Sequence, residues 1–274
     1  MTTTQKDKAL QFEALHKREG VFLIPNPWDA GSARMLAGLG FEAFATSSAA
    51  SAGVLGRRDG KITRDEAMAH VRGIVDATVL PVSADLESGF GAEPATVAET
   101  IRMAAQAGLV GASIEDSSGN SEKPLYDLTL ATERIAAAVE TVRSLPFPFM
   151  VTARAENFFR GTPDLDDAIT RLLAYEKAGA DVLFAPALPD LTAVKAVCAA
   201  VSKPVNFMVG IKGKSFTVAE LDAAGVKRIS LSASFYRAAM SGLAAAAREV
   251  KEQGTFTYLD HSLGMPDLAR FFAD

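Results

Sequence analysis

One pattern recurs eight times along this chain: a short apolar, β-branched run is followed by an amphipathic stretch with helical spacing. The runs predict strands at Val21–Pro25, Ala43–Ser48, Pro81–Asp85, Gly111–Asp116, Phe149–Glu156, Ala180–Ala187, Pro204–Val209 and Arg228–Ser232. Strands that alternate with helices form a parallel sheet. Eight such units in about 250 residues favour a closed (β/α)8 barrel, the TIM barrel, over an open doubly wound sheet.

The stretches between the strands carry the signals of helix ends. The expected helices are Ala30–Leu39, Thr63–Ala77, Pro94–Ala107, Leu130–Arg143, Leu165–Ala178, Leu191–Val201, Val218–Ala224 and Phe235–Gln253. Thr63 with Glu66 three residues later predicts a capping box. Other helices should begin at Asp29, Asp164 and Asp190 and end before Gly40, Gly108, Gly179 and Gly225. An open nucleotide-binding sheet is the competing fold, but no G-x-G-x-x-G motif follows the first strand.

We expect a single domain over residues 1–274, because no linker or low-complexity tract divides the chain. From about residue 255 a helical tail follows, with apolar Leu268, Phe271 and Phe272 that the eight-unit count does not use. The tail either folds over the barrel of its own chain or packs against another subunit.

The composition excludes several classes of function. Acids and bases are interspersed and the net charge is −5, so no basic patch suits a nucleic acid. The single cysteine, Cys198, excludes an intrachain disulfide and a Cys-based zinc site. The polar first residues lack the apolar run of a signal peptide, and no segment approaches the roughly 20 apolar residues of a membrane span. We therefore expect a cytoplasmic protein with no nucleic-acid or membrane partner.

In a barrel of this kind, the carboxyl ends of the strands face the active site. The polar residues at those ends are Thr46, Ser47, Ser48, Asp85, Glu87, Glu115, Asp116, Arg154, Glu156, Asn157, Asn206, Ser230 and Ser232. Converging oxygen ligands suit Mg²⁺, which needs only one or two direct carboxylates and keeps several waters. Mn²⁺ would fit the same oxygens. Arg154 could then bind a substrate carboxylate as a bidentate fork.

Each of these residues also has a purely structural interpretation. Asp85 and Glu87 alternate along a strand and share a face, where they repel each other unless a cation lies between them. A solitary D-x-E more often caps a loop or pairs with a lysine. Glu115 could begin a helix, and Arg154 could form a buried structural ion pair. Their joint occurrence at consecutive strand ends favours a site.

Three ordered motifs, at residues 84–91, 111–116 and 152–154, resemble the isocitrate lyase/phosphoenolpyruvate mutase superfamily. That family shows D-x-D/E-x-G-Y/F-G, then G-x-x-I/L-E-D, then A-R-x-D/E, at similar spacings. The resemblance extends from about Phe12 to Ala246 and includes the segments 25–30, 40–49, 56–59 and 178–181.

The resemblance implies a Mg²⁺-dependent enzyme in which Asp85 binds the metal directly and Glu87 and Glu115 hold metal-bound waters. Predicted catalytic residues are Arg154, Asp59 and Glu115, and predicted metal residues are Asp85, Glu87 and Glu115. Predicted substrate-binding residues are Ser47, Ser48, Ala49, Arg154, Asn206 and Ser232, the last two from their places at strand ends. Members of the family often form dimers or tetramers that exchange C-terminal helices, so the tail is a candidate for exchange between subunits.

The loop after the fourth strand departs from the family's lyases, which carry K-K-C-G-H there with the cysteine as acid and base. Residues 117–127 read S-S-G-N-S-E-K-P-L-Y-D, with no Cys or His. Cys198 is expected to be a structural thiol on a helix. His16 and His70 fall on helices and His261 in the tail. Asn120, Ser121 and Lys123 do not follow the order found in phosphonomutases, and Tyr126 could donate a proton, although packing is the favoured role.

A metal–enolate core without this acid suffices to decarboxylate a β-keto acid, which mainly needs an electron sink at a metal-bound carbonyl. We therefore predict a lyase that cleaves a C–C bond in, or decarboxylates, a small 2-keto or 2-hydroxy di- or tricarboxylic acid through a metal-stabilised enolate. The alternatives are a phosphonopyruvate/phosphoenolpyruvate-type phosphonomutase, a non-catalytic α-keto-acid-binding protein, and a barrel whose acids are only structural. The predicted partners are a small carboxylic acid and further copies of the chain, as a dimer or tetramer.

Overall fold

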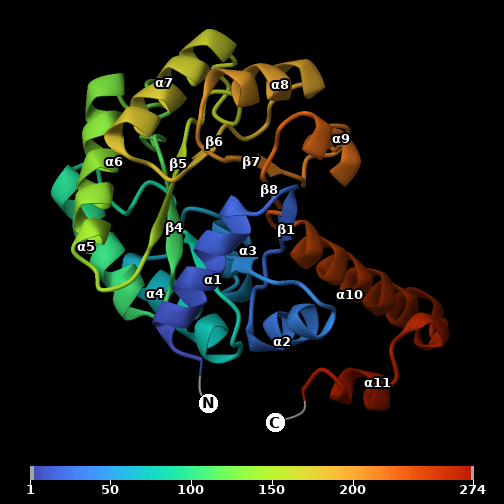
Figure 1. Ribbon diagram of the computed structural model, residues 1–274. Helices are drawn as coiled ribbons and strands as arrows, with labels where there is room; N and C mark the ends of the chain where they lie inside the picture. The colour runs from blue at the N-terminus through green and yellow to red at the C-terminus, as the bar shows by residue number, and fades with distance from the viewer. Residues whose placement is uncertain (1–2, 273–274) are drawn as a thin grey trace.

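Eight parallel strands form the centre of the computed structural model, which describes residues 3–272 (Figure 1). They are β1 (Phe22–Ile24), β2 (Phe44–Ala45), β3 (Val82–Asp85), β4 (Gly111–Glu115), β5 (Met150–Arg154), β6 (Val182–Phe184), β7 (Val205–Met208) and β8 (Arg228–Ser230). Each strand from β2 to β8 pairs with its neighbour in sequence, and β8 also pairs with β1. The Ala45 N–H donates to the Pro25 carbonyl at 3.1 Å and links β2 to the end of β1. The predicted (β/α)8 barrel is confirmed.

Helices surround the strands in the expected alternation. They are α2 (Ala30–Gly38), α4 (Arg64–Asp76), α5 (Pro94–Gln106), α6 (Leu128–Arg143), α7 (Leu165–Ala178), α8 (Leu191–Ala200), α9 (Val218–Ala223) and α10 (Ser234–Gln253). The capping box at Thr63 and the caps at Asp29, Asp164 and Asp190 are confirmed. Gly40, Gly108, Gly179 and Gly225 have φ of 90°, 90°, 101° and 92°, the left-handed conformation typical of residues that follow a helix.

Two helices were not among those expected. The first, α1 (Gln5–Lys17), begins with a capping box between Thr4 and Asp7 and lies across the amino ends of the strands. Its Phe12 is fully buried in a cluster with Phe22 and Met150. Because this helix closes one end of the barrel, the inward-facing polar side chains are reached from the opposite end.

The second unexpected helix, α3 (Ser48–Val54), starts where the sequence suggested the end of the second strand. The Ser47 side chain accepts a hydrogen bond from the Ala50 N–H at 3.5 Å, so Ser47 is a helix cap and not a strand residue. The predicted strand Ala43–Ser48 is therefore wrong in its last residues. The change brings the first turn of α3 to the mouth of the barrel.

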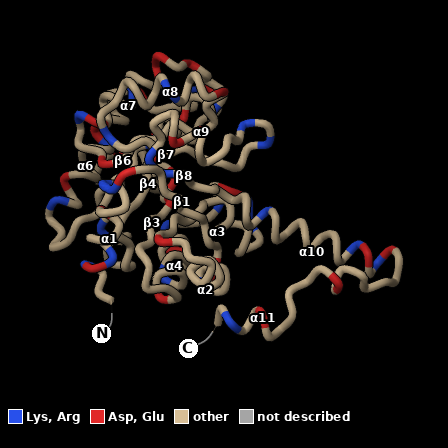
Figure 2. The backbone as a smooth tube through the Cα atoms, turned by 45° about the vertical axis from the view of Figure 1, so that its right-hand side comes forward, with Lys and Arg blue, Asp and Glu red and all other residues tan. Residues whose placement is uncertain are grey.

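The C-terminal segment leaves the barrel as an arm, comprising α10, a 3-10 turn at Thr257–His261 and α11 (Met265–Ala269) (Figures 1 and 2). None of these three elements has a buried residue. The end of the arm returns to α2 of its own barrel, where the ring of Phe271 occupies the space beside Gly38. A Cβ at Gly38 would lie only 2.6 Å from that ring.

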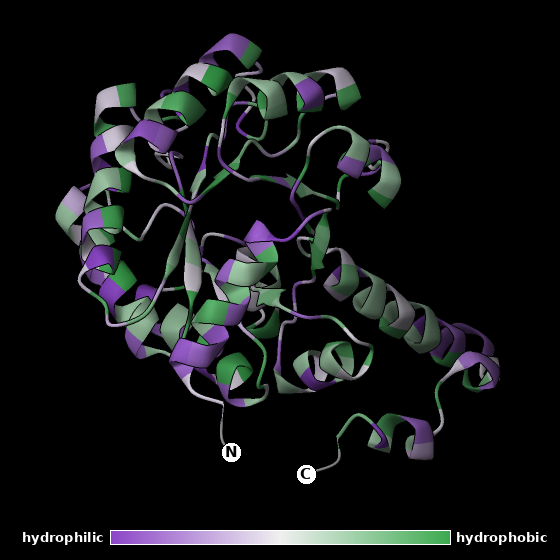
Figure 3. Cartoon of the chain, viewed as in Figure 1, coloured by the Kyte–Doolittle hydropathy of each residue, from purple (hydrophilic) through white to green (hydrophobic). Residues whose placement is uncertain are grey.

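Much of α10 is coloured as hydrophobic, with hydrophilic residues gathered at its far end (Figure 3). Within residues 3–272, no helix is both long and apolar enough to cross a membrane.

Candidate active site

A cavity of about 290 Å³ opens at the carboxyl ends of the strands. That volume is near the lower end of the range for small-molecule sites. Every site residue that the sequence predicted lines it: Ser47, Ser48, Ala49, Asp59, Asp85, Glu87, Glu115, Arg154, Asn206 and Ser232. The positions of these residues are thus brought together as expected, while their roles stay predictions.

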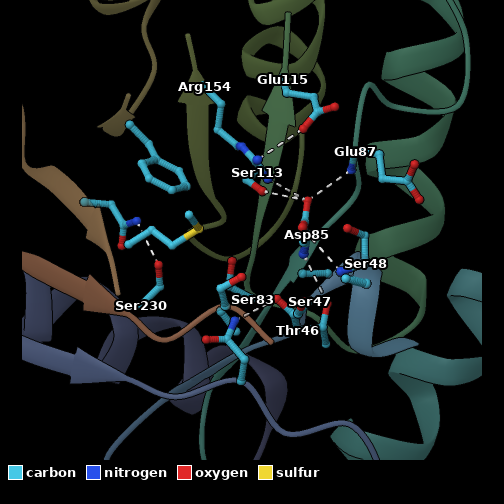
Figure 4. A pocket seen from close by; sticks show the side chains of 18 of the residues that line it. Thr46, Ser47, Ser48, Ser83, Asp85, Glu87, Ser113, Glu115, Arg154 and Ser230 are labelled. Carbon is cyan, nitrogen blue, oxygen red and sulfur yellow. Dashed lines mark hydrogen bonds and ion pairs between the residues drawn. The ribbon is translucent and has the colours of Figure 1, made fainter. Parts of the chain in front are cut away.

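Asp85, the last residue of β3, lies at the centre of the polar contacts in this cavity (Figure 4). Its Oδ1 accepts hydrogen bonds from Arg154 Nη1 at 2.9 Å and from the Glu87 N–H at 3.2 Å. Its Oδ2 accepts from the N–H of Ser48, the first residue of α3, at 3.3 Å. The backbone N–H groups of Glu87 and Ser48 therefore hold the Asp85 carboxylate from two sides.

Arg154 ends β5 and contacts three carboxylates. Its guanidinium nitrogens lie 2.9 Å from Asp85, 3.2 Å from Glu115 and 2.9 Å from Glu156. Burial alone would lower the pKa of Arg154, but the charges of Glu156, Asp85 and Glu115 raise that pKa well above its usual value. Arg154 is therefore a permanent cation with a fixed orientation. It forms structural ion pairs with the three acids and also lines the cavity.

The acids of the cavity repel one another. Burial, followed by the charges of Asp85, Asp59 and Glu115, raises the pKa of Glu87 to about 7. Burial likewise raises the pKa of Glu115, against the opposing effect of Arg154. A divalent cation among these carboxylates would relieve the repulsion, so the donor set fits a hard metal such as Mg²⁺.

The acids do not form a complete coordination shell for a metal ion. In the described part of the chain, no three His, Cys, Asp or Glu side chains are arranged so that all could hold one metal ion. Mg²⁺ does not require such a shell, since it usually binds through one or two carboxylates and retains water. Asp85 as a direct ligand, with Glu87 and Glu115 further out, is consistent with this preference.

Two residues of the cavity have a strained backbone. Glu87 and Ser232 each have φ of 51°, a left-handed conformation that is uncommon for residues other than glycine. Gly210 lies beside Ser232, where an added Cβ would be 3.2 Å from the serine Cβ. Strain of this kind persists where surrounding structure holds it, often at binding sites.

Sequence reasoning did not single out Arg160, which lies in the loop after β5. Its Nη2 pairs with Glu115 at 2.7 Å, and its Nε lies 3.6 Å from Glu156. The side chain is 36% exposed and lines the cavity. No motif marks this position, because a loop arginine in a sequence is usually a solvated residue. A second missed cation, Arg228, lies at the floor of the cavity.

Some polar residues at strand ends have structural roles instead. Asp116 accepts hydrogen bonds from Tyr175 Oη at 2.6 Å and Arg171 Nη1 at 3.1 Å, away from the cavity. Asn157 donates to Asp167 at 2.6 Å. These contacts tie the ends of β4 and β5 to α7.

The loop after β4 does not reach the cavity. Lys123 pairs with Asp127 at 2.7 Å on the surface, and the ring of Tyr126 lies under the Arg134 guanidinium at 4.3 Å. The packing role expected for Tyr126 is consistent with this contact. Cys198 is half-buried on α8, and burial raises the pKa of its thiol to about 11. No Lys, Cys or His is among the described residues that line the cavity.

Comparison with known proteins agrees with this geometry. A model of the phosphoenolpyruvate phosphomutase family matches residues 12–251. A solved structure from Burkholderia cenocepacia J2315, assigned as a lyase/mutase, is 51% identical, has a TM-score of 0.96 and covers 98% of both chains. The 2-methylisocitrate lyase of Escherichia coli strain K12 is 29% identical over 89% of this chain and 84% of its own. A solved 2,3-dimethylmalate lyase is 25% identical, with a TM-score of 0.85 over 100% of this chain and 95% of the other.

The chain therefore belongs to the phosphoenolpyruvate mutase/isocitrate lyase superfamily, as the three sequence motifs predicted. It is an enzyme of a superfamily of Mg²⁺-dependent C–C lyases and mutases. The motif residues Asp85, Glu87, Glu115 and Arg154 converge in the cavity at the carboxyl ends of β3, β4 and β5.

Proposed function

We propose that this enzyme is a Mg²⁺-dependent lyase that cleaves or decarboxylates a small 2-keto or 2-hydroxy di- or tricarboxylic acid through an enolate. The observation that carries the proposal is the joint presence in one cavity of the acids Asp85, Glu87 and Glu115 with the buried cation Arg154. A bound Mg²⁺ would supply a Lewis acid that polarises the carbonyl or hydroxyl next to the carboxylate.

The protein groups would bind and orient the substrate. Arg154 is held by three acids, which fixes the direction from which its guanidinium meets a substrate carboxylate. Ser47, Ser48 and Ala49 present the first turn of α3 on the other side of Asp85. The N–H groups of Ser48 and Ala50 already donate to Asp85 and Ser47, which leaves the Ala49 N–H as a donor for the α-keto acid end of the substrate. Asp59, in an exposed loop, borders the cavity entrance.

The lining of the cavity favours chemistry that needs neither a cysteine nor a histidine as the acid at the bond that breaks. Neither Cys nor His lines it in the part of the chain that the structure describes. In the decarboxylation of a β-keto acid, the electrons of the C–C bond move into the neighbouring carbonyl, and CO₂ leaves. Water can then protonate the enolate, so oxaloacetate is a substrate with the right chemistry for this site.

The test is calorimetry of pyruvate, oxaloacetate and 2-oxoglutarate with and without Mg²⁺, with NMR analysis of each mixture for products. Binding that requires Mg²⁺ and is lost in Asp85→Ala, together with a C–C cleavage product, would support the proposal. Asp127→Ala is the matched control, since Asp127 is exposed and lies outside the cavity. Absence of metal-dependent binding of all three acids would refute the proposal. Tight binding with no turnover across C4–C7 acids would favour a non-catalytic binding protein.

A phosphonomutase is the second candidate, favoured by the family model, which describes phosphoenolpyruvate phosphomutase. Against it, Lys123 and Asn120 make local contacts in the loop after β4 and do not line the cavity. Isomerisation of phosphonopyruvate, followed by phosphorus NMR, would separate it from the lyase.

We also propose that the enzyme is a homo-oligomer, a dimer or tetramer, associated through its C-terminal arm. Leu243, Leu259, Leu263 and Met265 are exposed along this arm, and several large apolar side chains exposed on one segment support a role as an interaction surface. Light scattering of the full chain should give a multiple of the monomer mass. The double substitution Leu243→Asp and Leu259→Asp should reduce the measured mass to that of the monomer. A monomeric full chain would refute this part.

A further inference from the structure

An arginine without an acidic partner lies at the floor of the cavity. Arg228, the first residue of β8, is 5% exposed and donates three hydrogen bonds. The acceptors are Asn206 Oδ1 at 2.8 Å, Thr152 Oγ1 at 3.0 Å and His16 Nε2 at 3.3 Å. Hence three of its five N–H groups are used, all on side chains that carry no negative charge.

His16 is neutral in this arrangement. Its Nδ1 lies 2.8 Å from the Phe12 carbonyl, which can only accept, so Nδ1 carries the proton and Nε2 accepts from Arg228. The ring lies edge-on between Phe12 and Phe22, at 4.7 and 4.9 Å. Burial and the charge of Arg228 lower the pKa of His16 to about 3.

Asn206 is fixed in the same way. Its Nδ2 donates to Ser230 Oγ at 3.0 Å, which leaves Oδ1 to accept from Arg228 Nε (Figure 4 shows Ser230 at the cavity wall). The three neutral partners of Arg228 therefore determine its orientation but do not compensate its charge.

Three other arginines around the barrel mouth are compensated by acids, and a fourth, the buried Arg134, donates to backbone carbonyls and lies outside the cavity. Arg154, Arg160 and Arg171 each pair with at least two acids within 4.0 Å. Among the acids that the structure describes, none lies within 4.0 Å of the Arg228 nitrogens. A buried cation is costly unless an anion approaches it, and the cavity is the side from which an anion can come.

The two cations lie at different depths of the same cavity. Thr152, which accepts from Arg228, is two residues before Arg154 on β5, so the Thr152 and Arg154 side chains both face the barrel interior and Thr152 lies about 6.6 Å nearer the amino end of the strand. Ser83, Ser113 and Ser230 line the same cavity and provide a polar surface. A small molecule with a negative group at each end could meet one of these two cations with each group.

We propose that Arg228 binds the second carboxylate of the substrate and so selects dicarboxylic over monocarboxylic 2-keto acids. The inference rests on the proposed function, because it assigns the far end of the molecule whose keto-acid end lies at Asp85 and Arg154. Asn206 and His16 are positioning residues for this guanidinium.

The test compares the affinities of oxaloacetate and 2-oxobutyrate, which differ in whether C4 is a carboxylate or a methyl group. Calorimetry with Mg²⁺ should show that the wild type binds oxaloacetate about 10- to 100-fold more tightly, the range for a charge-assisted hydrogen bond. In Arg228→Gln the preference should fall to within about threefold, mainly through weaker oxaloacetate binding. Arg143→Gln, an exposed arginine on α6, is the matched control and should keep the preference.

Asn206→Asp tests the same idea with Arg228 in place, and so covers the case in which Arg228→Gln does not fold. The new carboxylate would stand 2.8 Å from Arg228 Nε and neutralise it, so the preference for oxaloacetate should again be lost. Unchanged preference in folded Arg228→Gln or Asn206→Asp would overturn the inference and leave the proposed function intact. Failure of the wild type to bind either acid with Mg²⁺ would overturn both.

Discussion

The affinity of the cavity for Mg²⁺ should depend on pH through Glu87. Its pKa is raised to about 7 by burial and by Asp85, Asp59 and Glu115. A carboxylic acid with that pKa is about nine-tenths protonated at pH 6 and about nine-tenths ionised at pH 8. Mg²⁺ favours the ionised form, so a proton must leave at low pH before the metal binds. We expect Mg²⁺ to bind about tenfold more weakly at pH 6 than at pH 8.

The sign follows from which form the metal stabilises. Lowering the pH through 7 adds a proton to Glu87 and removes one negative charge from the cavity, so the affinity can only fall in that direction. Above pH 8 the residue is almost fully ionised, and the affinity should level off. At pH 7 about half a proton should be released for each Mg²⁺ bound, because half of the Glu87 carboxyl groups then carry one.

Isothermal calorimetry of Mg²⁺ at pH 6, 7 and 8, in buffers of different ionisation enthalpy, measures both the affinity and the proton release. Glu87→Gln cannot titrate and should remove most of the pH dependence and the released proton. Glu133→Gln, at an exposed position on α6, should leave both unchanged. Equal affinities at pH 6 and pH 8, or the same pH dependence in Glu87→Gln as in the wild type, would show that Glu87 does not control the metal site.

Three substitutions should lower the stability of the fold by different amounts. Arg134→Met removes the buried guanidinium that donates to backbone carbonyls at the end of β4 and in the loop after β3, and we expect a loss of about 3 kcal/mol in urea unfolding and weaker Mg²⁺ binding. Tyr175→Phe removes a buried hydrogen bond to Asp116 and should cost about 2 kcal/mol in the same assay with Mg²⁺ affinity unchanged. Phe12→Ala opens a cavity beneath the barrel and should cost roughly 3–5 kcal/mol by thermal unfolding. Losses below 0.5 kcal/mol in any of the three would contradict the corresponding contact.

The eight strands could be predicted because each has two buried faces and therefore reads as an apolar run. The active-site acids could be predicted because polar residues such as Asp85 and Arg154 stand at the point where such a run ends. Both signals are local in the sequence. They needed only the rule that the carboxyl ends of parallel strands meet at one edge.

The features that were missed depend on contacts between distant segments. Helix α1 has a mostly polar sequence, and its few apolar residues are informative only once the open amino end of the barrel is known. Helix α3 is a run of serine, alanine and glycine that ends in Val54 and has no apolar period, and the cap at Ser47 was hidden by its place directly after a strand. Arg160 acts through Glu115 and Glu156, and nothing in the sequence places a loop arginine near them.

The inward direction of Arg228 could have been predicted from the sequence, because side chains alternate between the two faces of a strand. In the run Val226–Ser230, Ile229 faces the surrounding helices, so Arg228 and Ser230 must face the barrel interior. The neighbouring Lys227 points to the surface, where it contacts backbone carbonyls of the α1–β1 loop. Two adjacent basic residues are typical of an exposed turn, so residue type alone did not indicate that Arg228 is buried. Alternation along the strand distinguishes the buried Arg228 from Lys227.

Asp85 is both the proposed ligand of the metal and a partner of Arg154, the proposed ligand of the substrate carboxylate. Arg154 Nη1 already donates to Asp85 Oδ1, so a metal on the same carboxylate would share it with the arginine and weaken that bond. Each Nη group of Arg154 has a second N–H, and a weakened bond to Asp85 leaves the guanidinium freer to meet an anion from the cavity. Metal and substrate carboxylate should therefore bind more tightly together than separately, since the charge each adds is compensated by the other.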